Sequence, residues 1–187
     1  MSREEILNKT GKGTVRIMHY QSPVGAMILG SYGDRLCMCD WTVEKRRGTI
    51  DRRIQYYLNA SYEKGSSSVI ERAIKELDGY FAGELRELSI PVLFTGSEFQ
   101  CSVWSELMKI PYGITISYSE LARRIRNPKA VRAVASANAT NPISIFVPCH
   151  RVIGSNRKLT GYGGGLVAKQ FLLELEERVS GTSLFAG

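Results

Sequence analysis

The chain has 187 residues, 43% of them hydrophobic, which suffices for one globular domain or two small ones and excludes a disordered tail protein. No run approaches the roughly 20 apolar residues of a membrane helix, and the charged start Met-Ser-Arg-Glu-Glu is unlike a signal peptide. We therefore expect a soluble protein, cytoplasmic and nucleoid-associated in a prokaryote or nuclear in a eukaryote. The four cysteines favour a reducing compartment over a disulfide framework.

The positive charge is concentrated in one segment. Residues 117–160 carry eight basic residues against one acidic residue, Glu120, so their local net charge of +7 equals that of the whole chain. The basic residues are Arg123, Arg124, Arg126, Lys129, Arg132, Arg151, Arg157 and Lys158. A confined positive field favours binding to a phosphate backbone. The alternative is an ordinary solvated basic face.

The first half of the chain predicts a small α+β unit. Turn sequences at 22–25 and 32–34 bracket a strand over 26–30, and a second strand over 35–41 completes a hairpin. A strand over 89–94 closes this half. Between them, apolar residues at helical spacing predict a helix, namely Val69, Ala73, Leu77, Tyr80 and Phe81, followed by Gly83.

The second half has a different pattern. Ser97 and Gln100 form a capping box that opens a helix running to Ile110. We therefore divide the chain into an N-terminal domain, 1–95, and a C-terminal domain, 96–187.

Two short helices in this half have the spacing of a helix-turn-helix. Ser117 and Glu120 form a capping box for a helix through Ile125. Asn127-Pro128 starts the next helix and Asn141-Pro142 stops it, because a proline disfavours helical backbone at the preceding residue. Since the second helix carries basic charge, the pair indicates DNA binding.

The second helix is poor in bulky side chains. Apart from Arg132 it offers few groups that could read base edges, so a DNA-binding role would depend on shape. Its small residues include Ala130, Ala133, Ala135 and Ser136. The alternative is a helix packed tightly inside the fold.

A candidate nucleophile follows an apolar run. Residues 143–147 predict a strand, and Pro148 then introduces Cys149, His150 and Arg151. Thiolate is the reactive form, and neighbouring cations lower the pKa of a thiol. Because adjacent residues in extended backbone point to opposite sides, His150 would reach Cys149 through a water or a bent backbone. A single Cys-His pair also occurs by chance.

The other three cysteines lack such surroundings. Cys37 and Cys39 lie two apart on one predicted strand and share a face, with no second ligand pair for zinc. Cys101 lies among apolar residues of a predicted helix. We interpret all three as buried small hydrophobic residues.

Two runs resemble a known family. Residues 148–154 (PCHRVIG) and 160–166 (TGYGGGL) resemble the active-site signature of the O6-alkylguanine-DNA alkyltransferases, also called methylated-DNA–protein-cysteine methyltransferases. The resemblance is continuous over 97–177 and looser before residue 95. It extends upstream through Pro111-Tyr112-Gly113, Tyr118, Asn127-Pro128-Lys129-Ala130, Arg132 and Asn141-Pro142. It implies an N-terminal α+β domain with a small sheet and a mostly helical, winged helix-turn-helix-like domain that carries the active-site cysteine.

The resemblance also implies a DNA-repair activity. A methyl or other alkyl group passes irreversibly from O6-alkylguanine, and from O4-methylthymine, to Cys149 after the base is flipped out of the duplex, and each molecule reacts once. The implied catalytic residues are Cys149, His150, Glu176, Tyr118 and Asn141. Residues implied in DNA binding are Arg132, Ala130, Ala133, Ser136 and Arg151. The implied substrate pocket consists of Tyr118, Cys149, Val152, Tyr162, Gly163 and Gly164.

Individual roles follow from the same resemblance. His150 is linked to Cys149 through water and held by Glu176, Tyr118 donates a proton to the purine, and Asn141 ties backbone and Glu176 into position. Arg132 fills the gap that the flipped base leaves. From the residues alone, Glu176 is a solvated helix charge, Tyr118 a cap or core residue, and Asn141 a helix stop.

The implied partner is double-stranded DNA containing O6-alkylguanine, bound through the minor groove by a monomer, with no membrane, cofactor or metal. A competing hypothesis is a non-enzymatic DNA-binding protein that recognises alkylated bases or regulates transcription. A cysteine hydrolase is a third, but no oxyanion hole is evident in the sequence.

Overall fold

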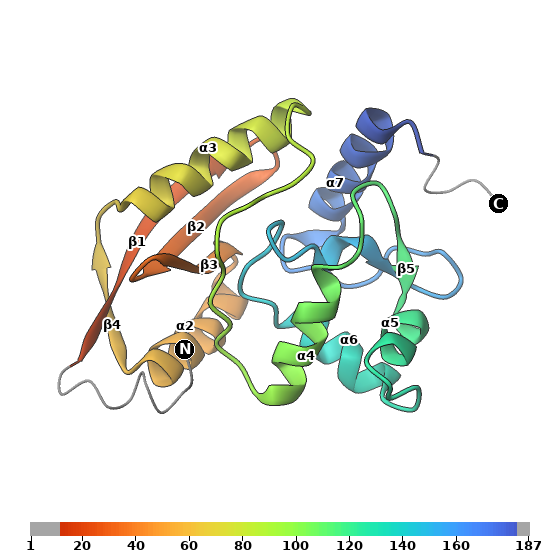
Figure 1. Cartoon of the computed structure of the whole chain (residues 1–187), viewed down its shortest axis with the longest axis horizontal. Helices are drawn as coiled ribbons and strands as arrows, with labels where there is room; N and C mark the ends of the chain where they lie inside the picture. The colour runs from red at the N-terminus through yellow and green to blue at the C-terminus, as the bar shows by residue number, and fades with distance from the viewer. Residues whose placement is uncertain (1–11, 183–187) are drawn as a thin grey trace.

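The computed structural model describes residues 12–182, in which an α/β half precedes a mostly helical half (Figure 1). The first half is built on a four-stranded sheet of order β3-β2-β1-β4. Strand β2 is antiparallel to β1 and β3, whereas β4 is parallel to β1. The strands are β1 (Gly13–Ser22), β2 (Gly25–Tyr32), β3 (Arg35–Trp41) and β4 (Ala60–Lys64).

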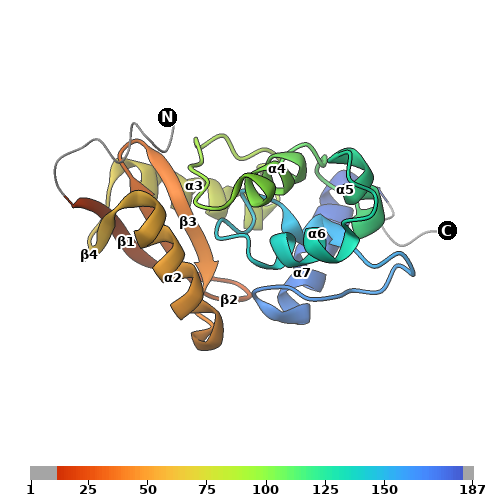
Figure 2. The ribbon, with the colours of Figure 1, turned by 90° about the horizontal axis from the view of Figure 1, so that it is seen from below.

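Two helices cover the two faces of this sheet (Figures 1 and 2). Helix α2 (Glu44–Leu58) packs an apolar stripe against one face, and helix α3 (Ser68–Ala82) packs against the other. Because side chains alternate between the two faces of a strand, neighbouring residues of β2 pack against different helices. Ile28 belongs to the cluster with α2, whereas Met27 and Leu29 belong to the cluster with α3.

The predicted hairpin and the helix ended by Gly83 are confirmed. Ser67 caps α3 by accepting a hydrogen bond from the Ile70 amide, and Gly83 adopts a left-handed conformation after it. One detail of the hairpin was wrong, because a bulge at Cys37 shifts the register between Gly30 and Ser31. Cys37 and Cys39 consequently pack in different clusters instead of sharing a face.

The predicted strand over 89–94 forms only a single bridge, from Val92 to Leu36. The Leu36 amide donates to the carbonyl of Pro91 at 2.9 Å, and the Leu93 amide donates back to Leu36 at 2.8 Å. Further along β3, the Cys39 amide donates to Pro142 O at 2.9 Å. The outer edge of β3 therefore binds the segment that leaves the first half and also a loop of the second half.

The second half contains the predicted helix-turn-helix. Both hydrogen bonds of the Ser97–Gln100 capping box are present, and Ser117 accepts from the Glu120 amide at 3.1 Å. Helix α6 begins at Val131, later than predicted, and ends at Ala139. The elements are α4 (Glu98–Leu107), β5 (Ile116–Ser117), α5 (Tyr118–Arg124), α6 (Val131–Ala139), the 3₁₀ helix η1 (Cys149–Arg151), β6 (Val152–Ile153) and α7 (Gly165–Ser180).

Strands β5 and β6 pair in parallel and connect the helix-turn-helix to the cysteine segment. One large core cluster contains residues of both halves, among them Leu77 of α3, Trp104 of α4, Val134 of α6 and Leu172 of α7. Within residues 12–182, no helix is long and apolar enough to cross a membrane.

Candidate active site

Cys149 follows a tight turn in place of the predicted strand. The amide of Val147 donates to Ile143 O at 2.9 Å, and that of Phe146 donates to Ser144 O at 3.0 Å. Ile145 has φ 74°, a left-handed conformation that is uncommon for a β-branched residue. The apolar run thus folds back on itself and delivers Cys149 to the first position of η1 instead of to a strand end.

Asn141 braces this turn from inside. Its Nδ2 donates to Val147 O at 2.9 Å, and its Oδ1 accepts from the Ile143 amide at 3.0 Å. The side chain is fully buried. The expectation that Asn141 also holds Glu176 is corrected, because the hydrogen bonds that Glu176 receives in the described part of the chain come from Tyr80, Gly113, His150 and Arg151. Asn138 of α6 reaches the same segment by donating to Cys149 O at 3.4 Å.

His150 and Glu176 form a buried pair with no exposed surface. Nε2 of His150 lies 2.8 Å from Oε1 of Glu176, which comes from α7. An ionised carboxylate only accepts hydrogen bonds, so Nε2 carries the proton and Nδ1 is the acceptor. Nδ1 is buried and has no hydrogen-bond partner among residues 12–182. The imidazole can therefore take up a proton at Nδ1 while Glu176 holds its other side.

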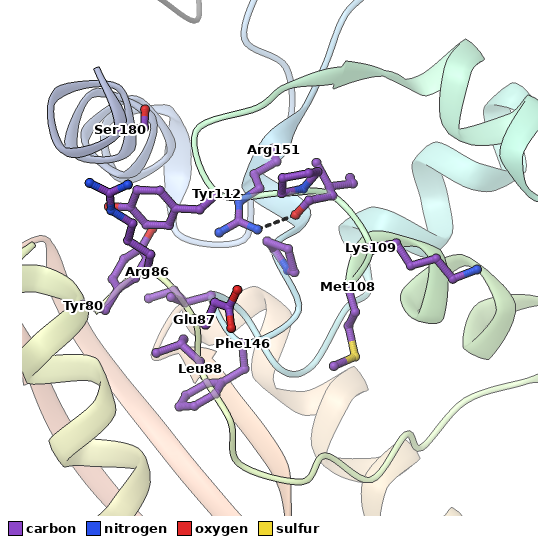
Figure 3. Close-up of a pocket in the computed structure, with 14 residues that line it drawn as sticks. Tyr80, Arg86, Glu87, Leu88, Met108, Lys109, Tyr112, Phe146, Arg151 and Ser180 are labelled. Carbon is purple, nitrogen blue, oxygen red and sulfur yellow. Dashed lines mark hydrogen bonds between the residues drawn. The ribbon is translucent and has the colours of Figure 1, made fainter. Parts of the chain in front are cut away.

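Arg151 lies inside the site. It is 8% exposed, and its Nε and Nη2 donate to Glu176 at 2.9 Å each, to Oε2 and Oε1 respectively. Its Nη1 donates to Ile110 O at 2.6 Å (Figure 3). The predicted contact of Arg151 with DNA is therefore corrected, because the buried carboxylate needs this guanidinium as its counter-charge.

Burial sets the protonation states of the three groups. It raises the pKa of the Cys149 thiol, although a hydrogen bond from Asn141 opposes the rise, and it lowers the pKa of His150 against the attraction of Glu176. Burial also disfavours ionised Glu176, but His150 and Arg151 outweigh it and hold the pKa of the carboxyl well below its usual range. At neutral pH the resting site therefore contains a thiol, a neutral imidazole and a carboxylate.

Lys169 is a fully buried lysine on α7 that the sequence analysis did not select. Its Nζ donates to Val152 O at 2.6 Å and to Thr160 O at 2.8 Å. Burial lowers the pKa of Lys169 to about 8, and Cys149 opposes this shift. The ammonium group thereby joins both ends of the loop between β6 and Thr160. Lys169 and Glu176 lie seven residues apart, which is two helical turns, on the buried face of α7. This spacing in the sequence could have indicated that both charged side chains face the core.

The predicted pocket residues other than Cys149 lie on α5, on β6 and in the loop before α7. Tyr118 opens α5, its hydroxyl accepts from Thr160 Oγ1 at 3.5 Å, and burial raises its pKa. Tyr162 packs edge-on against Trp41 of β3, with ring centroids 5.8 Å apart, and Val152 is fully buried on β6. A Cβ on Gly163 would lie 2.8 Å from the guanidinium carbon of Arg46, and one on Gly164 would overlap the Trp41 indole. These glycines therefore allow the loop to approach the first half closely.

Helix α6 presents an outer face of small residues. Arg132, Ala133 and Ser136 are exposed, whereas Ala130 is partly buried just before the helix begins. Of the eight basic residues of the segment 117–160, all except Arg151 are exposed. The positive charge therefore lies mainly on the surface around α5, α6 and the loop 154–160.

Helix α2 also reaches the site, although the sequence analysis did not predict it. Arg46 forms an ion pair with buried Asp40 at 3.0 Å and donates to the carbonyls of Ala139 and Asn141. Its charge also opposes the rise in the pKa of Cys149. No pattern in the sequence connects Arg46 to residues more than 90 positions away.

Comparisons with known proteins show the family of the chain. The model of the 6-O-methylguanine DNA methyltransferase ribonuclease-like domain matches residues 15–94, and that of the DNA binding domain matches residues 98–178. A methylated-DNA–protein-cysteine methyltransferase of Methanosarcina acetivorans is 43% identical over 84% of this chain and 95% of its own. The Mycobacterium leprae protein of the same name is 46% identical, covering 87% and 93%.

A solved structure is also similar. The Mycobacterium tuberculosis OGT in complex with DNA has a TM-score of 0.76 and 40% identity, covering 89% of this chain and 94% of its own. Two family models together span nearly all of residues 15–178, and the relatives match over most of their length. The chain belongs to the 6-O-methylguanine DNA methyltransferase family.

Proposed function

We propose that the protein repairs O6-alkylguanine in DNA by transferring the alkyl group irreversibly to its own Cys149, once per molecule. The observation that carries this proposal is the buried link between His150 and Glu176 directly after the cysteine. It leaves Nδ1 of His150 free to accept a proton, and the preceding residue carries a thiol that burial keeps protonated. The names of the relatives and the DNA complex of the M. tuberculosis protein support the same activity.

The transfer is a displacement at the alkyl carbon. The thiol proton of Cys149 moves to Nδ1 of His150, directly or through a water, and the thiolate attacks. A carbon–sulfur bond forms while the bond between carbon and O6 breaks, and its electron pair remains on guanine. The purine takes a proton from Tyr118, whose raised pKa keeps the phenol protonated until then. Glu176 stabilises the imidazolium that His150 becomes.

The damaged base must leave the duplex before it can reach Cys149, which is 4% exposed. We assign entry into the minor groove to the small residues of α6, where Ala133 and Ser136 are exposed beside Arg132. Arg132 would then occupy the space of the flipped base. The exposed basic residues around α5 and α6 would supply the phosphate contacts.

Mass spectrometry tests the proposal. Mixing the protein with a duplex containing O6-methylguanine should replace one hydrogen by one methyl group, located on the peptide with Cys149. Cys149→Ala should remain unmodified and still bind the duplex. A duplex with O4-methylthymine tests the wider substrate range. Binding without any gain in mass would favour a non-enzymatic DNA-binding protein, and a methyl group on Cys37, Cys39 or Cys101 would contradict the assignment to Cys149.

A further inference from the structure

Tyr80 connects the N-terminal α/β half to the proton relay. It comes from α3, is 1% exposed, and donates its hydroxyl to Oε1 of Glu176 at 2.8 Å. The same hydroxyl lies 3.4 Å from Nε2 of His150. In the sequence, Tyr80 is indistinguishable from the core residues of its helix. The mechanism outlined above does not use it.

The position of Glu176 depends on several converging donors. Oε1 receives hydrogen bonds from Tyr80, from Nε2 of His150 and from Arg151, whereas Oε2 receives the Gly113 amide at 2.9 Å. Tyr80 must be the donor of its contact, because the carboxylate only accepts and because burial beside Glu176 raises the pKa of the phenol. The phenol and the imidazole therefore bind one oxygen atom and fix each other's direction.

We propose that Tyr80 is a positioning residue for alkyl transfer, holding Oε1 of Glu176 against Nε2 of His150. This inference rests on the proposed function. It gives the N-terminal half a direct part in the chemistry, because one of its side chains sets the geometry of a relay formed by two distant segments of the C-terminal half. The hydrogen-bond contacts of its hydroxyl are with Glu176 and His150, so Tyr80 acts through the relay.

By donating a hydrogen bond, the Tyr80 hydroxyl also stabilises the negative charge of Glu176. Without it, the carboxylate would attract the proton on His150 more strongly, so the pKa of His150 should rise. Because His150 accepts the thiol proton in its neutral form, the acid limb of the rate profile should then move to higher pH. The other groups that face His150 do not change. They are Glu176 and Lys169 on α7, Arg151 in η1, and the ring of Tyr162 at 6.4 Å.

The chain offers a matched control for this hydroxyl. Tyr112 lies beside Tyr80, with ring centroids 5.9 Å apart, and its ring packs 5.6 Å from the guanidinium of Arg151. The hydroxyl of Tyr112 has no hydrogen-bond partner within residues 12–182. Figure 3 shows both tyrosines and Arg151 around one cavity. The volume of this cavity is about 500 Å³. Tyr80→Phe and Tyr112→Phe therefore remove the same atom from neighbouring rings, and only the first removes a contact with the relay.

The first experiment measures transfer rates against pH on an O6-methylguanine duplex and on free O6-benzylguanine. Tyr80→Phe should slow both reactions by about tenfold, because Oε1 of Glu176 is no longer held against Nε2 of His150, and should move the acid limb to higher pH. Tyr112→Phe should match the wild type. A loss on the duplex alone, or a loss without movement of the acid limb, would mean that Tyr80 serves only folding or DNA binding and would overturn the proposal.

The second experiment does not depend on transfer. The chain has two histidines, and exposed His19 on β1 provides an internal reference for a proton NMR titration of His150. The pKa of His150 should be higher in Tyr80→Phe than in the wild type and in Tyr112→Phe. Equal values in all three would overturn the positioning role even if the wild type transfers alkyl groups. Failure of the wild type to transfer would instead contradict the proposed function, whatever the titration gives.

Discussion

The end of the helix-turn-helix depends on arginines from the other half of the chain. Helix α6 has no basic residue in its last turn, and its final carbonyls point toward α2. Arg53 Nη2 donates to Thr140 O at 2.7 Å, while Arg46 binds the carbonyls on either side. Cations are favourable at a helix C-terminus because they oppose its dipole. Replacing Arg53 by methionine should therefore destabilise the fold and loosen α6.

Three contributions set the size of this effect. A hydrogen bond from a charged donor contributes about 1.5–3 kcal/mol, and the guanidinium also lies 5.2 Å from the Trp104 ring centroid. Two costs offset part of this stabilisation. Burial and the nearby charge of Arg46 disfavour the charged guanidinium and lower the pKa of Arg53, and its Nε has no hydrogen-bond partner in the described part of the chain. We expect Arg53→Met to lower the free energy of unfolding by about 1–2 kcal/mol, which corresponds to about 2–8 °C in Tm.

Thermal unfolding and transfer kinetics together test this reasoning. Arg52 is an exposed neighbour on the same helix, so Arg52→Met should change the stability by less than about 0.5 kcal/mol. Because α6 is the helix that we propose enters the DNA, Arg53→Met should also slow transfer from a duplex more than transfer from free O6-benzylguanine. If Arg53→Met unfolds at the same temperature as Arg52→Met, the capping argument is refuted. Equal slowing on both substrates would refute the link to α6.

Two further predictions concern the recognition helix and the buried carboxylate. Arg132→Ala should slow duplex repair far more than reaction with free O6-benzylguanine, which needs no base flipping, and equal losses would assign Arg132 to the pocket or to folding. Glu176→Gln should cost about 3–5 kcal/mol near pH 7, because Arg151 loses its counter-charge. The pKa of Glu176 is lower in the folded than in the unfolded protein, so its ionised carboxylate stabilises the fold above the unfolded pKa, and this stabilisation is lost as pH falls. Denaturant titrations should therefore show the free energies of unfolding of the wild type and of Glu176→Gln converging below about pH 4.5.

Local signals predicted the helices whose ends have capping residues. Ser67 and Gly83 delimit α3, and Ser97 with Gln100 starts α4, because each cap uses contacts within a few residues. Helix α2 lacks such signals. The apolar residues of α2 form only a narrow stripe among charged side chains, and the helix contains Gly48. Val43, which precedes the helix, provides no side-chain cap. Packing on the sheet, which the sequence does not reveal, stabilises it.

The candidate site shows the same division between local and distant contacts. Cys149 and His150 were found because they are adjacent in a recognisable run, whereas the contact of Tyr80 with Glu176 joins residues 96 positions apart. The strand predicted before Cys149 was wrong for a related reason. Ile145 has strong strand propensity, but the hydrogen bonds of Asn141 hold the segment in a tight turn.

The protonation states of the resting site suit a cysteine that reacts only once. Burial keeps Cys149 as a thiol and His150 as a neutral imidazole, so the reactive thiolate is scarce until the proton moves between them. In the proposed mechanism, that movement creates an imidazolium whose charge is stabilised by Glu176, which Arg151 keeps ionised. A substrate bound beside the thiol consumes the thiolate as it forms and draws this equilibrium forward. The same arrangement protects Cys149 from electrophiles that do not enter the pocket, because both its low exposure and its raised pKa oppose their reaction.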